Sequence, residues 1–267
     1  MTPPASPIHH EVSGDLAAGT PVLLLRPIVG TIALWGAFRS ELALRRPVIA
    51  CEARGIGRSP PAVVPTTTRG MARDAAALLD TLQVSRAHVF GLSLGGMVAT
   101  WLAIDRPERV HALVLASTPP RGLDLVRFTP RSVSFARCTA RGSGEREACL
   151  ARHALSDRFC RDHPHETASI LASVRGERGS LRSLLLHSAA GALHHPGESL
   201  RRIDAPTLCI AGALDPLARP GSWSALSSAI RDSELEVLDE AGHDLSLERP
   251  VELAERVERF LARHDPR

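Results

Sequence analysis

The chain has 267 residues, of which 44% are hydrophobic, enough to bury one substantial core. Its 32 basic and 29 acidic residues give a formal net charge of only +3. Such a balance argues against a nucleic-acid partner or a membrane surface held by charge, so we expect a small organic substrate. The oligomeric state is not encoded in any of these numbers.

The start of the chain has no basic run followed by an apolar stretch, so we predict no secretion signal. No window of about 18 uncharged apolar residues follows, so we predict no membrane span. The cysteines are Cys51, Cys138, Cys149, Cys160 and Cys209. An odd, scattered set without a CxxC pair is typical of a reducing compartment, so we expect a cytoplasmic protein.

Three of the cysteines, Cys138, Cys149 and Cys160, recur at eleven-residue intervals, about three turns of a helix. Glycine and charged residues at 141–147 should break a helix at that point. We therefore expect that these cysteines form neither a disulfide nor a metal site.

Short apolar runs follow one another along the chain, typical of strands buried on both faces of a parallel sheet. They span residues 22–25, 48–51, 87–90, 112–116, 207–211 and 235–238. Helical patterns separate most of them, at residues 71–82, 96–104, 223–230 and 251–263. Strand and helix alternate, so the predicted fold class is α/β with a mostly parallel central sheet.

The alternation stops between residues 119 and 202, where Arg, Ser and His are frequent and several short helices are expected. An insertion of this length is too long for a connecting loop and is better explained as a helical cap that shapes the substrate pocket. We therefore divide the chain into a core, residues 1–118 and 203–267, and a cap, residues 119–202. We expect most of the cap histidines to be solvated, among them His163, His165, His187, His194 and His195.

The chemistry-bearing motif is Gly91-Leu92-Ser93-Leu94-Gly95, between a predicted buried strand and a predicted helix. A serine on such a strained turn projects its hydroxyl out of the sheet, and side chains in place of Gly91 and Gly95 would collide with neighbouring backbone. The helix that follows directs its first amides at the substrate. Ser93 is therefore the candidate nucleophile, against the alternative of a purely structural turn.

A serine hydroxyl needs a base within hydrogen-bond reach and an acid that orients the base. Asp215 follows the strand predicted at residues 207–211, and His243 lies in the loop after the next strand. Both are therefore at carboxyl ends of strands, where open α/β sheets bind ligands. Alone, either residue could be an ordinary loop residue, but the order Ser93, Asp215, His243 predicts a catalytic triad.

The segments around these residues resemble the 3-oxoadipate enol-lactonase branch of the α/β-hydrolases. The resemblance rests on residues 91–104, 106–110, 113–118 and 205–216 and on Ala241-Gly242-His243. It extends over residues 21–119 and from 202 to the end, but not over the cap. It implies an α/β-hydrolase fold and hydrolysis without a metal or organic cofactor.

The resemblance also implies an oxyanion hole made by two backbone amides, those of Ile28 and Leu94. Many relatives carry His-Gly at the two positions before the first donor, whereas this chain carries Arg26-Pro27. Pro27 has no N–H, but the donor position is Ile28. The guanidinium of Arg26 could bind a substrate carboxylate or pair with Glu52 or another loop acid; we favour the pair.

Together these features predict a serine hydrolase that cleaves a small carboxylic ester or lactone through an acyl-enzyme on Ser93. An acyl thioesterase, a cyclase or a carboxylesterase of a biosynthetic pathway would use the same triad. A ligand-binding protein that keeps the fold without turnover is a further alternative. The loop at residues 52–59, which begins with Glu52, is given no catalytic role.

Overall fold

The computed structural model describes residues 8–28, 30–124, 133–134, 137–176, 180–218 and 220–266. A seven-stranded sheet has the order β1-β3-β2-β4-β5-β6-β7. The strands are β1 His10–Ser13, β2 Val22–Leu25, β3 Val48–Cys51, β4 Ala87–Leu92, β5 Val110–Ala116, β6 Thr207–Gly212 and β7 Ser233–Leu238. β1 runs antiparallel to β3, and the other neighbouring strands are parallel.

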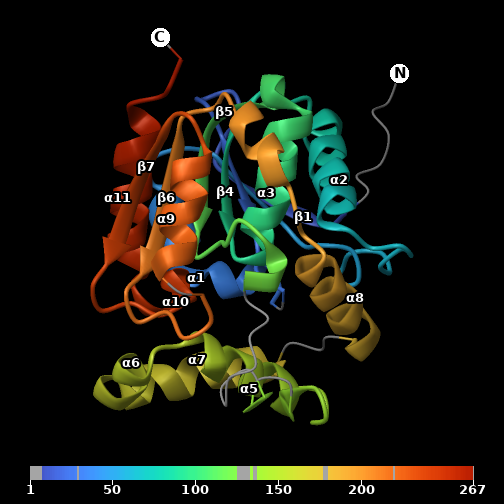
Figure 1. Cartoon of the computed structure of the whole chain (residues 1–267), viewed down its shortest axis with the longest axis vertical. Coiled ribbons are helices and arrows are strands. Elements are labelled where there is room, and N and C mark those ends of the chain that lie inside the picture. Colours follow the sequence, from blue (N-terminus) through green and yellow to red (C-terminus); the bar gives the residue numbers. More distant parts are fainter. Residues whose placement is uncertain are drawn as a thin grey trace.

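Helices cover both faces of the sheet (Figure 1). On one face lie α2 Thr68–Thr81, α3 Leu94–Asp105 and α9 Pro220–Ala229, and on the other lie α1 Gly36–Ala43 and α11 Pro250–Ala262. The short α10 Leu245–Glu248 precedes α11. The predicted mostly parallel α/β sheet is confirmed.

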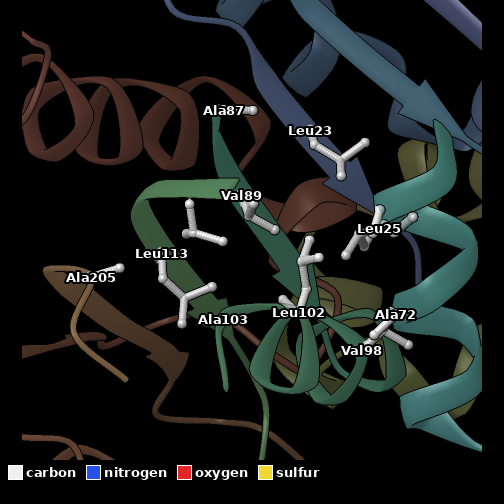
Figure 2. Packing of buried hydrophobic residues seen from close by; sticks show 14 of the residues in the cluster. Leu23, Leu25, Ala72, Ala87, Val89, Val98, Leu102, Ala103, Leu113 and Ala205 are labelled. Carbon is white, nitrogen blue, oxygen red and sulfur yellow. The ribbon is translucent and has the colours of Figure 1, made fainter. Parts of the chain in front are cut away.

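The strands β2, β3, β4 and β6 are buried at every residue, because helices pack on both of their faces. This double burial is the physical reason for their uninterrupted apolar sequence. In Figure 2, Leu23, Val89 and Leu113 of three neighbouring strands lie above Val98 and Leu102 of α3. The packed core fixes the ends of the strands from which the candidate site residues emerge.

Between β5 and β6 the chain forms α5 Glu145–Ala154, α6 Asp157–Asp162, α7 Pro164–Gly176 and α8 Leu181–Ala192. In Figure 1, α5, α6 and α7 form a layer of their own below the sheet. None of the helices in the described part of the chain has the length and apolar character needed to cross a membrane.

The expectation that the cysteines form no disulfide is wrong for one pair, because Cys138 is bonded to Cys149, with 5.6 Å between their Cα atoms. The predicted helix break is the reason. The chain turns at residues 139–144 and α5 begins at Glu145, so Cys138 folds back onto the first half of α5. The cysteine pattern therefore no longer supports a reducing compartment.

Candidate active site

Ser93 lies on a sharp turn between β4 and α3, with the backbone angles φ 55° and ψ −117°. Its amide donates to the carbonyl of Ala116 on β5 (2.8 Å), and its carbonyl accepts from Gly96 (2.9 Å) and Met97 (3.1 Å). These bonds hold a side-chain-bearing residue at a positive φ that is costly for any residue except glycine. The turn presents the Ser93 hydroxyl at the carboxyl edge of the sheet.

The glycines of the turn are required by close backbone approach. A Cβ on Gly91 would lie 2.4 Å from the carbonyl oxygen of Gly95, and a Cβ on Gly95 would lie 2.0 Å from that of Leu25. Real Cβ atoms do not approach other atoms so closely, and backbone cannot move aside as a flexible side chain can. Gly95 therefore sets the distance between the nucleophile turn and the end of β2.

We expect Gly95→Ala to lower the free energy of unfolding by about 3 kcal/mol, because its methyl group must displace either β2 or α3. Activity should fall as well, since the turn carries Ser93. Urea unfolding measures the first effect. Gly19→Ala is the matched control, because a Cβ at Gly19 meets no atom within 4 Å. Equal midpoints for the two variants would contradict the close packing at Gly95.

The structure brings Ser93, His243 and Asp215 into one hydrogen-bonded chain. Nε2 of His243 lies 2.8 Å from Oγ of Ser93, and Nδ1 lies 2.8 Å from Oδ2 of Asp215. The His243 side chain is 5% exposed and that of Asp215 is fully buried. This is the geometry that a serine hydroxyl, a proton-accepting imidazole and an orienting carboxylate require.

Backbone hydrogen bonds in the loops that carry Asp215 and His243 fix the positions of these two residues. The other carboxylate oxygen of Asp215, Oδ1, accepts from the amides of Leu217 (2.7 Å) and Ala218 (2.9 Å). The loop after β6 is joined to the loop after β7 by the amide of Leu214, which donates to the carbonyl of Ala241 (3.0 Å). The acid and the base therefore keep their relative position without a substrate.

The pKa of His243 is raised above its ordinary value. Burial acts to lower this pKa, but the charge and the hydrogen bond of Asp215 raise it, and the charges of Asp244 and Glu248 add to the increase. The carboxylates favour the imidazolium that forms when the imidazole takes a proton. At low pH the same carboxylates keep His243 protonated and unable to act as a base.

We therefore expect kcat/KM for a neutral ester to fall as the pH decreases through a midpoint above the ordinary histidine pKa of about 6.5. The midpoint lies above 6.5 because the pKa of His243 is raised, so that His243 takes up its proton at a higher pH than a free imidazole does. A pH profile of wild type gives the midpoint. Asp244→Asn should lower it by removing one of the charges that raise the pKa. A wild-type midpoint below 6.5 would contradict this electrostatic picture.

The two residues predicted to supply the oxyanion donors line the same cavity as Ser93. Leu94 is the first residue of α3 and Ile28 follows β2, and both line one cavity with Ser93 and His243. Within the described ranges, neither amide donates a hydrogen bond to another residue. An oxyanion needs backbone donors that have no acceptor of their own, and the role of these two amides stays a proposal.

Arg26 is nearly buried and pairs with an acid, though not with Glu52. Its Nη2 lies 3.4 Å from Oδ2 of Asp244, and its guanidinium lies 4.5 Å from the centre of the Trp35 ring. Glu52 instead accepts from the amides of Ile32 (3.3 Å) and Arg58 (2.7 Å) and shapes its own loop. The structural pair that we favoured for Arg26 is thus formed with a different loop acid.

Sequence reasoning missed the contacts that anchor the His243 loop to the inserted helices. The buried Glu248 accepts from the amide and hydroxyl of Ser156 (2.6 and 2.9 Å) and from the amide of Gly242 (3.0 Å). The carbonyl of Ala154 accepts from the amide of His243 (2.9 Å). The only signal in the sequence is an acid five residues after His243, which by itself indicates nothing about Ser156.

The cavity in front of Ser93 has a volume of about 290 Å³. Its wall includes Leu150 and Ala151 from α5, Val174 from α7, and His187 from α8. His187 is buried and lies 3.0 Å from the carbonyl oxygen of Arg54, so it is not one of the solvated histidines expected in this segment. The inserted helices therefore supply part of the surface that a bound molecule would contact.

Comparison with known proteins shows that the chain is an enzyme of the hydrolase class. A family model described as alpha/beta hydrolase fold matches residues 20–135. The protein named "Putative carbamate hydrolase RutD" of Variovorax paradoxus (strain S110) is 31% identical over 96% of this chain and 97% of its own length. The chain belongs to the α/β-hydrolase fold family.

Two further relatives bear on the enol-lactonase resemblance. 3-Oxoadipate enol-lactonase 2 of Acinetobacter baylyi (strain ATCC 33305 / BD413 / ADP1) is 29% identical over 92% of this chain and 90% of its own length. The solved structure of Est816, described as an N-acyl homoserine lactone degrading enzyme, has a TM-score of 0.80 and 28% identity, over 95% of this chain and 96% of that one. The resemblance to enol-lactonases is confirmed.

Proposed function

We propose that the protein is a serine hydrolase that cleaves a small carboxylic ester or lactone through an acyl-enzyme on Ser93. The observation that carries the proposal is the hydrogen-bonded chain from Ser93 through His243 to Asp215, which opens into the cavity. Two relatives named as lactone-acting enzymes support the ester or lactone bond as the target.

The reaction follows from the positions of the donors and acceptors. Nε2 of His243 takes the proton of Ser93 while Oγ attacks the carbonyl carbon, and Asp215 orients the imidazole and stabilises its charge. The amides of Ile28 and Leu94 bind the oxyanion. The imidazolium then gives its proton to the leaving oxygen, and a water activated by His243 releases the acid. No step requires a metal or an organic cofactor.

The segment at residues 119–202 acts in this proposal as a cap over the site. Helices α5, α7 and α8 supply part of the cavity wall, and Glu248 joins the His243 loop to Ser156 between α5 and α6. A cavity of about 290 Å³ suits a small substrate, near the lower end of the usual range for ligand sites. The cap therefore limits the size of the acyl and leaving groups.

A second candidate is carbamate hydrolysis, favoured by the relative named as a carbamate hydrolase over almost the whole chain. A carbamate carbonyl is open to the same attack by Ser93, so the site geometry fits both. Acyl thioesters would also use this triad.

A substrate panel separates these reactions. Wild type is assayed with short p-nitrophenyl esters, γ- and δ-lactones, acyl thioesters and an O-alkyl carbamate, with Ser93→Ala as the control for uncatalysed hydrolysis. The proposal expects the highest kcat/KM among the esters or lactones. A carbamate as best substrate would favour the second candidate, and turnover unaffected by Ser93→Ala would contradict both.

A further inference from the structure

The cavity beside Ser93 has mainly apolar walls, to which the core and the inserted helices both contribute. Leu34, Met97 and Leu247 line it from the core, and Leu150 and Val174 line it from α5 and α7. A hydrocarbon group that enters loses contact with water and packs against these side chains, which is favourable.

Among the described residues that line the cavity, Arg26 and Asp244 are the two that carry a full charge, and they are paired with each other. Their side chains are 5% and 6% exposed. The hydroxyl of Ser246 donates to the other oxygen of Asp244 (2.6 Å), and Arg26 also donates to the carbonyl of Leu34 (3.3 Å). The guanidinium is therefore engaged on several sides before any substrate arrives.

The imidazole of His187 does not supply a second cation. Burial lowers the pKa of His187, more than its hydrogen bonds to the backbone of Arg54 and Ile28 raise it. The remaining titratable group of the wall is His243, whose partner is Asp215. The described residues of the cavity wall therefore include no unpaired positive charge that could bind an anion.

From this arrangement we infer that the site selects substrates whose acyl part is uncharged and largely apolar, and that it discriminates against esters or lactones bearing a carboxylate. The inference rests on the proposed function. A substrate carboxylate would leave water, meet the carboxylate of Asp244 and have to displace it from Arg26. A methyl group at the same place is not repelled by Asp244, does not have to displace it from Arg26, and loses no favourable hydration.

Three methyl esters with a six-carbon acyl chain test the inference, because they differ at the far end of the chain only. They are methyl hexanoate, monomethyl adipate and methyl 6-aminohexanoate, which end in a methyl group, a carboxylate and an ammonium group. Hydrolysis is followed by NMR at pH 8.5. We expect kcat/KM for methyl hexanoate to exceed that of monomethyl adipate by about 100-fold. At 1.4 kcal/mol for each factor of ten, this ratio is a discrimination of about 2.8 kcal/mol.

Asp244→Asn makes the test specific to the charge pair. The substitution preserves the shape of the side chain but removes the charge that holds Arg26, so the ratio of adipate-ester to hexanoate-ester turnover should rise at least about tenfold. Because both substrates use the same base, a change in His243 cancels in this ratio. Asp239→Asn, an exposed position near the same loop, is the control and should leave the ratio unchanged.

Equal rates for the three esters, a preference for the adipate ester, or a ratio unaffected by Asp244→Asn would overturn the inference. A preference for the adipate ester that disappears in Arg26→Met would assign Arg26 to substrate binding instead. These outcomes leave the proposed function intact if Ser93 still reacts with a fluorophosphonate. Loss of that reaction would contradict the proposed function itself.

Discussion

Ser93→Ala is expected to lower kcat for a p-nitrophenyl ester by roughly 10⁴- to 10⁶-fold, because among the described residues that line the cavity Ser93 alone has a hydroxyl hydrogen-bonded to His243. The oxyanion donors and the cavity remain, so KM should change much less than kcat. The fold should be intact, since Ser93 holds its turn through backbone bonds that alanine can also make.

Steady-state kinetics and thermal unfolding together check this result. The control is Ser169→Ala, which should behave like wild type, because Ser169 is exposed on α7 and its hydroxyl donates to the carbonyl of His165 in the same helix. Turnover by Ser93→Ala within tenfold of wild type would show that a different residue attacks the substrate.

Asp215→Asn is expected to lower kcat by about 10⁴-fold with little change in structure. In wild type, Oδ1 of Asp215 accepts from two backbone amides and Oδ2 faces Nδ1 of His243. The carbonyl oxygen of the new amide should take the place of Oδ1, which directs its NH₂ group at Nδ1. The imidazole would then carry its proton on Nε2, where it can no longer accept the proton of Ser93.

The same kinetic assay, with Asp239→Asn as a control for loss of a carboxylate near the site, measures this effect. Reactivity of Ser93 toward a fluorophosphonate should decline in parallel with kcat. A decrease of less than tenfold in kcat would mean that His243 is oriented by its backbone anchors alone, and that Asp215 is not needed to set its tautomer.

The strands and helices that could be predicted from the sequence are those in which the local residue pattern agrees with the tertiary environment. Four-residue runs such as Val48–Cys51 are apolar throughout because helices cover both faces of the sheet. The edge strand β1 was missed, because its residues His10–Ser13 are mostly polar and only partly buried. α1 is short and begins with Gly36, so it also lacks a strong helical signal.

The site was predictable as far as chain order determines it. Ser93, Asp215 and His243 each follow a recognisable strand, and parallel strands bring their carboxyl ends to one edge. The partner of Arg26 was not predictable, because Asp244 is distant in sequence and several loop acids were equally plausible.

The inserted segment was the hardest part to predict. Spacing placed Cys138 and Cys149 on one face of a helix, but the turn between them decides their contact, and its path does not follow from periodicity. Likewise the bonds between Glu248 and Ser156 join two segments that are distant in sequence, and their relative position depends on the whole fold. Helices of this segment supply part of the cavity wall, so the residues that would contact a substrate include some whose placement was hardest to predict.

The most direct test of the account is mass spectrometry of the intact protein after reaction with a fluorophosphonate, followed by peptide mapping. We predict one adduct, on Ser93, that forms in wild type, is absent from Ser93→Ala and forms far more slowly in His243→Gln. An adduct on another serine, or no adduct on a folded protein, would contradict the assignment of Ser93 as the nucleophile.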